Sequence, residues 1–123
     1  MKKNIKVICF DLDGVICKTK GNKYLKSVPI KKNIDFVNFL FKKGYIIKVY
    51  TARGMGRSDD NFNFAKKKYY KLTTRQLNFW GVSFHKLILG KASYDLVIDD
   101  KSIFFKKNWK NILLKKVGLN ARS

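Results

Sequence analysis

Two carboxylates close an apolar run near the start of the chain, and this segment constrains the fold more than any other. The run Val7-Ile8-Cys9-Phe10 leads directly into Asp11-Leu12-Asp13-Gly14. A continuous run of this kind predicts a buried strand over residues 6–10, in a parallel sheet covered on both faces. Since a buried, unpaired carboxylate costs several kcal/mol, we expect a cation beside Asp11 and Asp13. Carboxylate, carbonyl and water oxygens suit Mg²⁺, so the segment indicates a magnesium site where a strand ends.

Strand and helix patterns alternate along the rest of the chain. Apolar runs predict three further strands, over residues 45–50, 86–89 and 95–98. Helical spacing with cap and stop signals predicts helices over residues 31–43, from a cap at Asp59 or Asp60 to about residue 70, from a Thr73/Gln76 capping box to Gly81, and from residue 102 onward. Residues 15–30 are predicted as a loop or small hairpin, and residues 51–58 as a polar loop. Strands that alternate with helices predict an α/β class fold, a three-layer Rossmann-like domain with a mainly parallel central sheet.

Length and cysteine usage predict a single cytoplasmic domain. The chain has 123 residues, 46% of them hydrophobic, which suits one compact domain over residues 1–123. Its two cysteines give no disulfide framework, and Cys9 is expected in the core. No stretch approaches the roughly 18 apolar residues of a membrane span. The short basic N-terminus does not have the pattern of a signal peptide, so we expect cytoplasmic residence without membrane association.

The charge balance is strongly basic, with 28 Lys+Arg against 8 Asp+Glu and a net charge of +20. Such an excess often indicates nucleic-acid binding. Here it consists almost entirely of dispersed lysines beside abundant Asn, Ile, Phe and Tyr, the residues that AT-rich codons specify. We therefore interpret the charge chiefly as a consequence of composition. It can still attract an anionic substrate.

Polar side chains follow each predicted strand where it ends. Asp11 and Asp13 follow the first strand, residues 51–53 the second, Lys91 the third, and the pair Asp99 and Asp100 the fourth. The carboxyl ends of parallel strands lie at one edge of the sheet, where α/β proteins bind their ligands. Each of these residues alone could be a loop or helix-cap residue. Together they predict one site.

These four segments resemble, in order, the motifs of the haloacid dehalogenase superfamily of phosphatases. The first motif is Asp11-Leu12-Asp13-Gly14-Val15, the second is Thr51, the third is Lys91, and the fourth is the pair Asp99 and Asp100. More narrowly, residues 51–54, 76–82 and 90–101 resemble small phosphatases encoded in capsular-polysaccharide clusters. The resemblance implies a haloacid dehalogenase-like (HAD-like) fold.

The resemblance also implies a role for each motif residue. Asp11 would be the nucleophile that forms an aspartyl phosphate, and Asp13 the acid and then the base. Thr51 would bind a phosphoryl oxygen, and Lys91 would neutralise the transferring group. Mg²⁺ would be held by Asp11, the main-chain carbonyl of Asp13 and Asp100, with Asp99 acting directly or through water.

Substrate contacts are expected from two loops. Ala52 and Arg53 follow Thr51, and Arg53 could either contact substrate or order its own loop. In residues 15–29, Lys18 and Asn22 are candidates for substrate selection. Members of the superfamily often insert a cap domain between the first and second or the second and third motifs. In this chain predicted elements fill both intervals, so it resembles the capless branch, in which a large substrate or a neighbouring subunit covers the site.

Three functions remain open on the sequence. The first is a Mg²⁺-dependent phosphomonoester hydrolase acting on a sugar or polyol phosphate in capsule or surface-polysaccharide biosynthesis. The second is the same chemistry on nucleic-acid ends or a phosphoprotein. The third is a noncatalytic basic nucleic-acid-binding module on the same fold, which would have no need of an aspartyl nucleophile.

Overall fold

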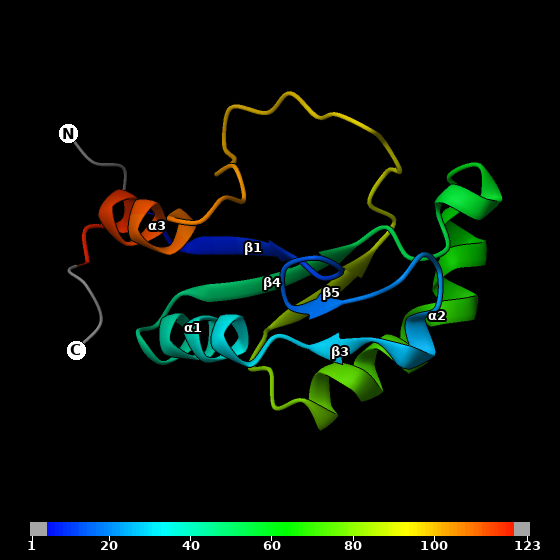
Figure 1. Cartoon of the computed structure of the whole chain (residues 1–123), viewed down its shortest axis with the longest axis horizontal. Helices are drawn as coiled ribbons and strands as arrows, with labels where there is room; N and C mark the ends of the chain where they lie inside the picture. The colour runs from blue at the N-terminus through cyan, green and yellow to red at the C-terminus, as the bar shows by residue number, and fades with distance from the viewer. Residues whose placement is uncertain (1–4, 120–123) are drawn as a thin grey trace.

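The computed structural model describes residues 5–119 and contains a parallel three-stranded sheet with three helices (Figure 1). The strands of the sheet lie in the order β1-β4-β5 and are parallel throughout. Two short strands, β2 and β3, form a separate antiparallel hairpin. The elements in chain order are β1 (Val7–Asp11), β2 (Cys17–Lys18), η1 (Tyr24–Lys26), β3 (Val28–Pro29), α1 (Lys31–Lys42), β4 (Ile46–Thr51), η2 (Gly56–Ser58), α2 (Phe62–Phe79), β5 (Lys86–Leu89) and α3 (Trp109–Val117). The α/β prediction is confirmed, as are the predicted first three strands, the first helix and the hairpin, within a residue or two.

One face of the sheet forms the core. Phe10, Val49 and Leu87 lie side by side in register and are all buried. The helices complete this core: the Trp109 ring of α3 lies 6.2 Å from that of Phe10 and 5.3 Å from that of Phe36 in α1. Burial of such side chains contributes about 1.5–3 kcal/mol each. This packing fixes the strand ends that carry the polar residues.

The other face of β1 is open to solvent, which corrects one prediction. Burial alternates along the strand rather than running continuously, with Val7 47% exposed and Cys9 also exposed. Alternation arises because β1 is an edge strand with only one sheet face covered. Cys9 was expected in the core and is not there.

The predicted strand at residues 95–98 is absent from the described part of the chain. Residues 91–108 instead form a long connection that arcs away from the sheet between β5 and α3 (Figure 1). Leu96 and Ile98 are almost wholly exposed. A strand needs a neighbour to satisfy its backbone groups, and this segment pairs with none.

The last helix is shorter than predicted, because it begins at Trp109 rather than near residue 102. Phe104 and Phe105 have helical spacing but remain exposed. Without a surface to pack on, helical spacing alone does not stabilise a helix. The end of the predicted helix, residues 120–123, lies outside the described residues.

Two predicted helices between residues 59 and 81 are one helix, α2. Its N-cap is Asn61, whose Oδ1 accepts a hydrogen bond from the Phe64 N–H at 3.0 Å. Asp59 and Asp60, the predicted caps, have left-handed backbone with φ of 53° and 61°. Thr73 lies inside the helix and is fully buried. No helix breaker separates residues 70 and 73, so the helix continues. Thr73 and Gln76 therefore do not cap a helix, and their side chains accept hydrogen bonds from Arg53 instead.

The intervals where a cap domain would be inserted hold only these elements. Between Asp13 and Thr51 lie the hairpin, α1 and β4, and between Thr51 and Lys91 lie η2, α2 and β5. Within residues 5–119, no helix combines the length and apolar character needed to cross a membrane.

Candidate active site

A pocket of about 550 Å³ lies at the carboxyl edge of the sheet, where the sequence predicts a site. Asp11 and Asp13 reach it from the end of β1, and Lys91 reaches it from the end of β5. The remaining walls come from the hairpin loop, the loop after β4 and the start of the long connection. Their lining residues are Thr19, Gly21, Asn22, Tyr24, Ala52, Arg53, Gly54, Gly56, Arg57, Ala92, Ser93 and Tyr94.

Asp11 and Lys91 form an ion pair at the pocket wall, with 3.4 Å between Lys91 Nζ and Asp11 Oδ2. The other oxygen, Asp11 Oδ1, accepts a hydrogen bond from the Leu12 N–H at 2.9 Å. Burial raises the pKa of Asp11 above its ordinary value, although Lys91 opposes the change. Burial alone would lower the pKa of Lys91, but a hydrogen bond with Tyr94 and the charge of Asp11 raise it. The pair therefore places a carboxylate oxygen and an ammonium side by side at the pocket wall.

Gly90 allows the chain to turn and present Lys91. Its φ is +96°, and a Cβ there would lie 2.7 Å from the Phe62 ring of α2. Both features require glycine. After this turn the Lys91 N–H donates to the Thr51 carbonyl at 3.2 Å, which ties the ends of β4 and β5 together.

Asp13 forms a second ion pair, with Arg53. Its carboxylate accepts hydrogen bonds from Arg53 Nε and Nη2, each at 3.0 Å, and from the Thr19 hydroxyl at 2.6 Å. Burial would raise the pKa of Asp13, but the hydrogen bonds and charge of Arg53 outweigh it and hold that pKa below its ordinary value. Asp13 is consequently a carboxylate in this arrangement.

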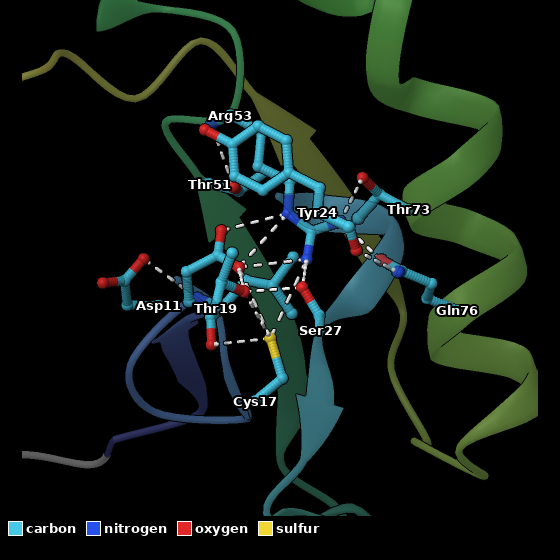
Figure 2. Close-up of polar contacts among 11 residues, drawn as sticks. Asp11, Cys17, Thr19, Tyr24, Ser27, Thr51, Arg53, Thr73 and Gln76 are labelled. Atoms are coloured by element: carbon cyan, nitrogen blue, oxygen red, sulfur yellow. Dashed lines mark hydrogen bonds and ion pairs between the residues drawn. The ribbon is translucent and has the colours of Figure 1, made fainter. Parts of the chain in front are cut away.

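Arg53 is the centre of a polar cluster that joins four parts of the chain (Figure 2). Its Nη1 donates to Thr73 Oγ1 at 3.1 Å and to Gln76 Oε1 at 2.5 Å, both in α2. Its Nη2 donates to Ser27 Oγ in the hairpin at 3.2 Å, and its guanidinium lies 4.8 Å from the Tyr24 ring centre. Arg53 is only 1% exposed. Since protein groups accept from all three of its nitrogens, the structure engages Arg53 internally.

The other predicted substrate residues lie in three different places. Ala52 and Asn22 line the pocket. Thr51 is fully buried beneath it, and its Oγ1 accepts from the Arg53 N–H at 3.1 Å. Lys18 lines a neighbouring hollow on the hairpin side of Asp13.

The structure does not bring Asp99 and Asp100 to this pocket. Both lie on the exposed connection, where Asp99 Oδ1 accepts from the Lys101 N–H at 2.8 Å in a local turn. Within residues 5–119, no group of three or more His, Cys, Asp or Glu side chains could hold a metal ion. Asp11 and Asp13 supply oxygen ligands of the type that Mg²⁺ takes, but each already faces a cation. The arrangement does not fit a complete magnesium site.

Several site residues had no local signal in the sequence. Thr19 and Ser27 bind the Asp13–Arg53 pair through hydroxyls of the hairpin, and Arg57 and Tyr94 line the pocket. Loop residues follow no repeating sequence pattern, so nothing in the sequence distinguishes these hydroxyl and arginine side chains from others. The helical position of Thr73 and Gln76, one turn apart, was the only available sign that they share a face.

Fold and site together define an α/β domain with a Rossmann-like, HAD-like fold and two carboxylate–cation pairs at the carboxyl edge of its sheet. A structural-genomics target from Vibrio cholerae has a similar structure, with a TM-score of 0.76 and 21% identity over 91% of this chain and 98% of that one. D,D-heptose bisphosphate phosphatase from B. bronchiseptica, solved with magnesium and phosphate, is also similar, with a TM-score of 0.50 and 12% identity. That match covers 94% of this chain but 65% of the phosphatase. These likenesses establish the fold, whereas no protein-family model and no curated protein matches the chain.

Proposed function

We propose that this protein is a phosphomonoester hydrolase that works through an aspartyl phosphate on Asp11, with a sugar or polyol phosphate as substrate. The observation that carries the proposal is the Asp11–Lys91 pair, 3.4 Å apart in an open pocket at the carboxyl ends of β1 and β5. The phosphate in the similar heptose bisphosphate phosphatase supports the same reaction class.

In the first step an Asp11 carboxylate oxygen attacks phosphorus, and the bond between phosphorus and the substrate alkoxide breaks. Lys91 offsets the negative charge that the carboxylate and phosphate bring together. The alkoxide takes a proton from Asp13. In the second step water attacks the phosphoryl group, Asp13 takes a proton from that water, and inorganic phosphate leaves with Asp11 restored.

Asp13 must exchange a proton in both steps, and Arg53 shapes that exchange. Arg53 keeps Asp13 ionised, which is the state that a base needs before it accepts a proton from water, and the same pairing lowers the basicity of the carboxylate. As the acid of the first step Asp13 must carry a proton: solvent supplies it before the first turnover, and the attacking water returns one in each second step. Thr51 accepts a hydrogen bond from the Arg53 N–H and still has its hydroxyl proton to donate, but it is fully buried, so it would bind a phosphoryl oxygen only if the residues that cover it move.

Mg²⁺ is the cofactor that we propose, on the basis of the two carboxylates and of the magnesium in the similar phosphatase. When bound, such an ion neutralises charge on an attacking carboxylate and a phosphate. Asp11 and the Asp13 carbonyl would provide the first ligands. Asp100, with Asp99, would join them only if residues 95–100 approach the exposed edge of β1.

The finer assignments belong to the same proposal. The short intervals between the motifs support a capless phosphatase. A role in capsule or surface-polysaccharide synthesis is proposed from the sequence resemblance of residues 51–54, 76–82 and 90–101, and cytoplasmic residence from the composition. Because the pocket is open, a second subunit or the substrate itself would exclude water from it.

Hydrolysis of para-nitrophenyl phosphate with Mg²⁺ tests the reaction. Asp11→Asn should abolish turnover, by more than about 10³-fold, and Lys91→Met should lower it by about 10²-fold or more. The matched control is Asp35→Asn, which removes an exposed carboxylate paired with Lys31 on α1 and should leave turnover unchanged. Intact-mass spectrometry of quenched enzyme should detect a phosphorylated form that Asp11→Asn lacks. No turnover across a broad panel of phosphoesters would refute the proposal.

A further inference from the structure

A second hollow opens beside the active-site pocket, on the hairpin side of Asp13. Its volume is about 940 Å³, and four lysines line it: Lys18, Lys20, Lys23 and Lys26. We call it the hairpin hollow. Asp13, Gly14, Thr19 and Val28 complete its lining. The residues that line it include four lysines and one carboxylate, so the lining has a net positive charge.

The lysines of the hairpin hollow have no acidic partner among residues 5–119. The ion pairs there join Lys31 to Asp35, Arg53 to Asp13 and Lys91 to Asp11. The one carboxylate in the hollow is thus already neutralised by Arg53. Like charges gathered on one short loop repel one another, so an anion bound among them would be stabilised.

The loop that carries these lysines is fixed to the body of the domain. Gln76 Nε2 donates to the Tyr24 carbonyl at 2.6 Å, and the Thr19 and Ser27 hydroxyls lie 2.6 Å apart. Arg53 holds Ser27 at 3.2 Å, as Figure 2 shows. A fixed loop lowers the entropy cost of binding, because only the lysine side chains need to be ordered.

The hairpin hollow adjoins the reacting centre. Asp13 and Thr19 line both it and the active-site pocket, so the two hollows are neighbours that meet at these residues. We propose that the hairpin hollow binds a second anionic group of the substrate, which is a phosphomonoester whose alcohol carries a further phosphate or carboxylate. This inference rests on the proposed phosphatase function and narrows its substrate class.

Three inhibitors with the same carbon chain test the inference: propyl phosphonate, 3-phosphonopropionate and propylene diphosphonate. The first carries a single phosphonate, the second a phosphonate and a carboxylate, and the third two phosphonates. Affinity is measured by calorimetry and by competition with para-nitrophenyl phosphate. We expect at least one two-anion compound to bind about 10-fold or more tightly than propyl phosphonate, and the stronger of the two identifies the second group.

Two triple variants each remove three positive charges, one in the hairpin hollow and one on α2. Lys20→Gln/Lys23→Gln/Lys26→Gln should reduce the preference for two anions about 10-fold, whereas Lys67→Gln/Lys68→Gln/Lys71→Gln on the exposed surface of α2 should change it less than about twofold. Melting curves confirm that both variants are folded. An equal reduction in the two variants would show general charge attraction and overturn the inference.

The remaining outcomes separate this inference from the proposed function. If the protein hydrolyses para-nitrophenyl phosphate but shows no preference for two-anion inhibitors, anion binding in the hairpin hollow is refuted and the proposed phosphatase activity is retained. A lysine-dependent preference without turnover of any phosphoester supports the hollow and refutes the phosphatase. A 5′-phosphorylated oligonucleotide that competes more strongly than propylene diphosphonate overturns the small-molecule assignment.

Discussion

Replacement of Arg53 by methionine should destabilise the protein strongly, because Arg53 is the one buried charged residue among residues 5–119. The change keeps an unbranched apolar stem, shortens the side chain and removes every hydrogen-bond donor from it. Asp13 would be left buried without its counter-ion, and the Thr73, Gln76 and Ser27 side chains would each lose a partner.

The magnitude follows from burial. Removal of one partner from a buried ion pair costs about 3–5 kcal/mol. The Arg53 side chain is 0% exposed and that of Asp13 is 27% exposed, so water relieves part of the cost at Asp13. Each lost neutral contact adds about 0.5–1.5 kcal/mol, reduced where water replaces the donor. We therefore expect a loss of about 3–5 kcal/mol, a large part of the 5–15 kcal/mol typical of a domain.

Urea unfolding of the wild type and Arg53→Met measures this loss, and its pH dependence identifies the cause. The pKa of folded Asp13 lies below its ordinary value of 3.8, so the carboxylate stabilises the fold above that pH and loses its contribution as pH falls through the folded pKa. The difference between the two proteins should be largest near neutral pH and should narrow below about pH 3.8.

Two further variants make this reasoning refutable. Arg53→Lys keeps the charge without the planar fork and should recover part of the lost stability. Arg57→Met removes an exposed arginine of the same loop that donates to the Tyr69 hydroxyl at 3.2 Å, and should cost less than about 1 kcal/mol. Equal losses in Arg53→Met and Arg57→Met, or a difference that does not vary with pH, would show that the Arg53–Asp13 pair does not stabilise the site as argued.

Three other properties can be predicted from the structure. Iodoacetamide at pH 8 should modify exposed Cys9 and spare Cys17, because burial raises the pKa of Cys17 to about 11 and leaves only about one thiol in a thousand ionised; peptide mapping that finds equal labelling would contradict its buried position. Asn61→Ala should cost about 1 kcal/mol in urea unfolding through loss of the α2 cap, while Asn63→Ala, two residues further on, should cost almost nothing. If Asp100 is a magnesium ligand, saturating Mg²⁺ should slow amide hydrogen exchange in residues 95–100, and Asp100→Asn should remove that protection; exchange that ignores Mg²⁺ would exclude these acids from the metal site.

The parts of the fold that the sequence predicts well are those whose signals are local. The predicted helix over residues 31–43 has apolar residues on one face and Gly44 just past its end, and the structure has α1 at Lys31–Lys42. The apolar runs that became β4 and β5 are bounded by polar residues and glycine, and β5 was placed without error. In these segments local preference and tertiary packing favour the same structure.

In the candidate site, the sequence predicts which strand ends have charged or polar side chains, but it does not predict which of these side chains pair with one another. Asp11 and Lys91 could be placed together because parallel strands end at one edge. The partners of Arg53 could not, since they come from the hairpin and α2, far apart in the chain and without a shared pattern. The Thr73/Gln76 spacing predicts a helix start for the same reason. The three-residue spacing of Thr73 and Gln76 is the same in a capping box and in a pair of helix residues that accept from a buried arginine. Only the position of Arg53 in the fold distinguishes the two cases.

The segment at residues 95–98 shows why a strand cannot be predicted from its own residues alone. Its apolar run resembles that of β5, and it is followed by two carboxylates as β1 is. Yet Leu87 and Leu89 of β5 are buried beside β4, whereas Leu96 and Ile98 are exposed, and no strand in the described part of the chain pairs with the outer edge of β1. A strand forms only where a second segment pairs with it, because its backbone hydrogen bonds join it to a neighbouring strand. Whether Asp99 and Asp100 reach Asp11 therefore depends on pairing at the edge of β1, and the proposed metal site depends on the same event.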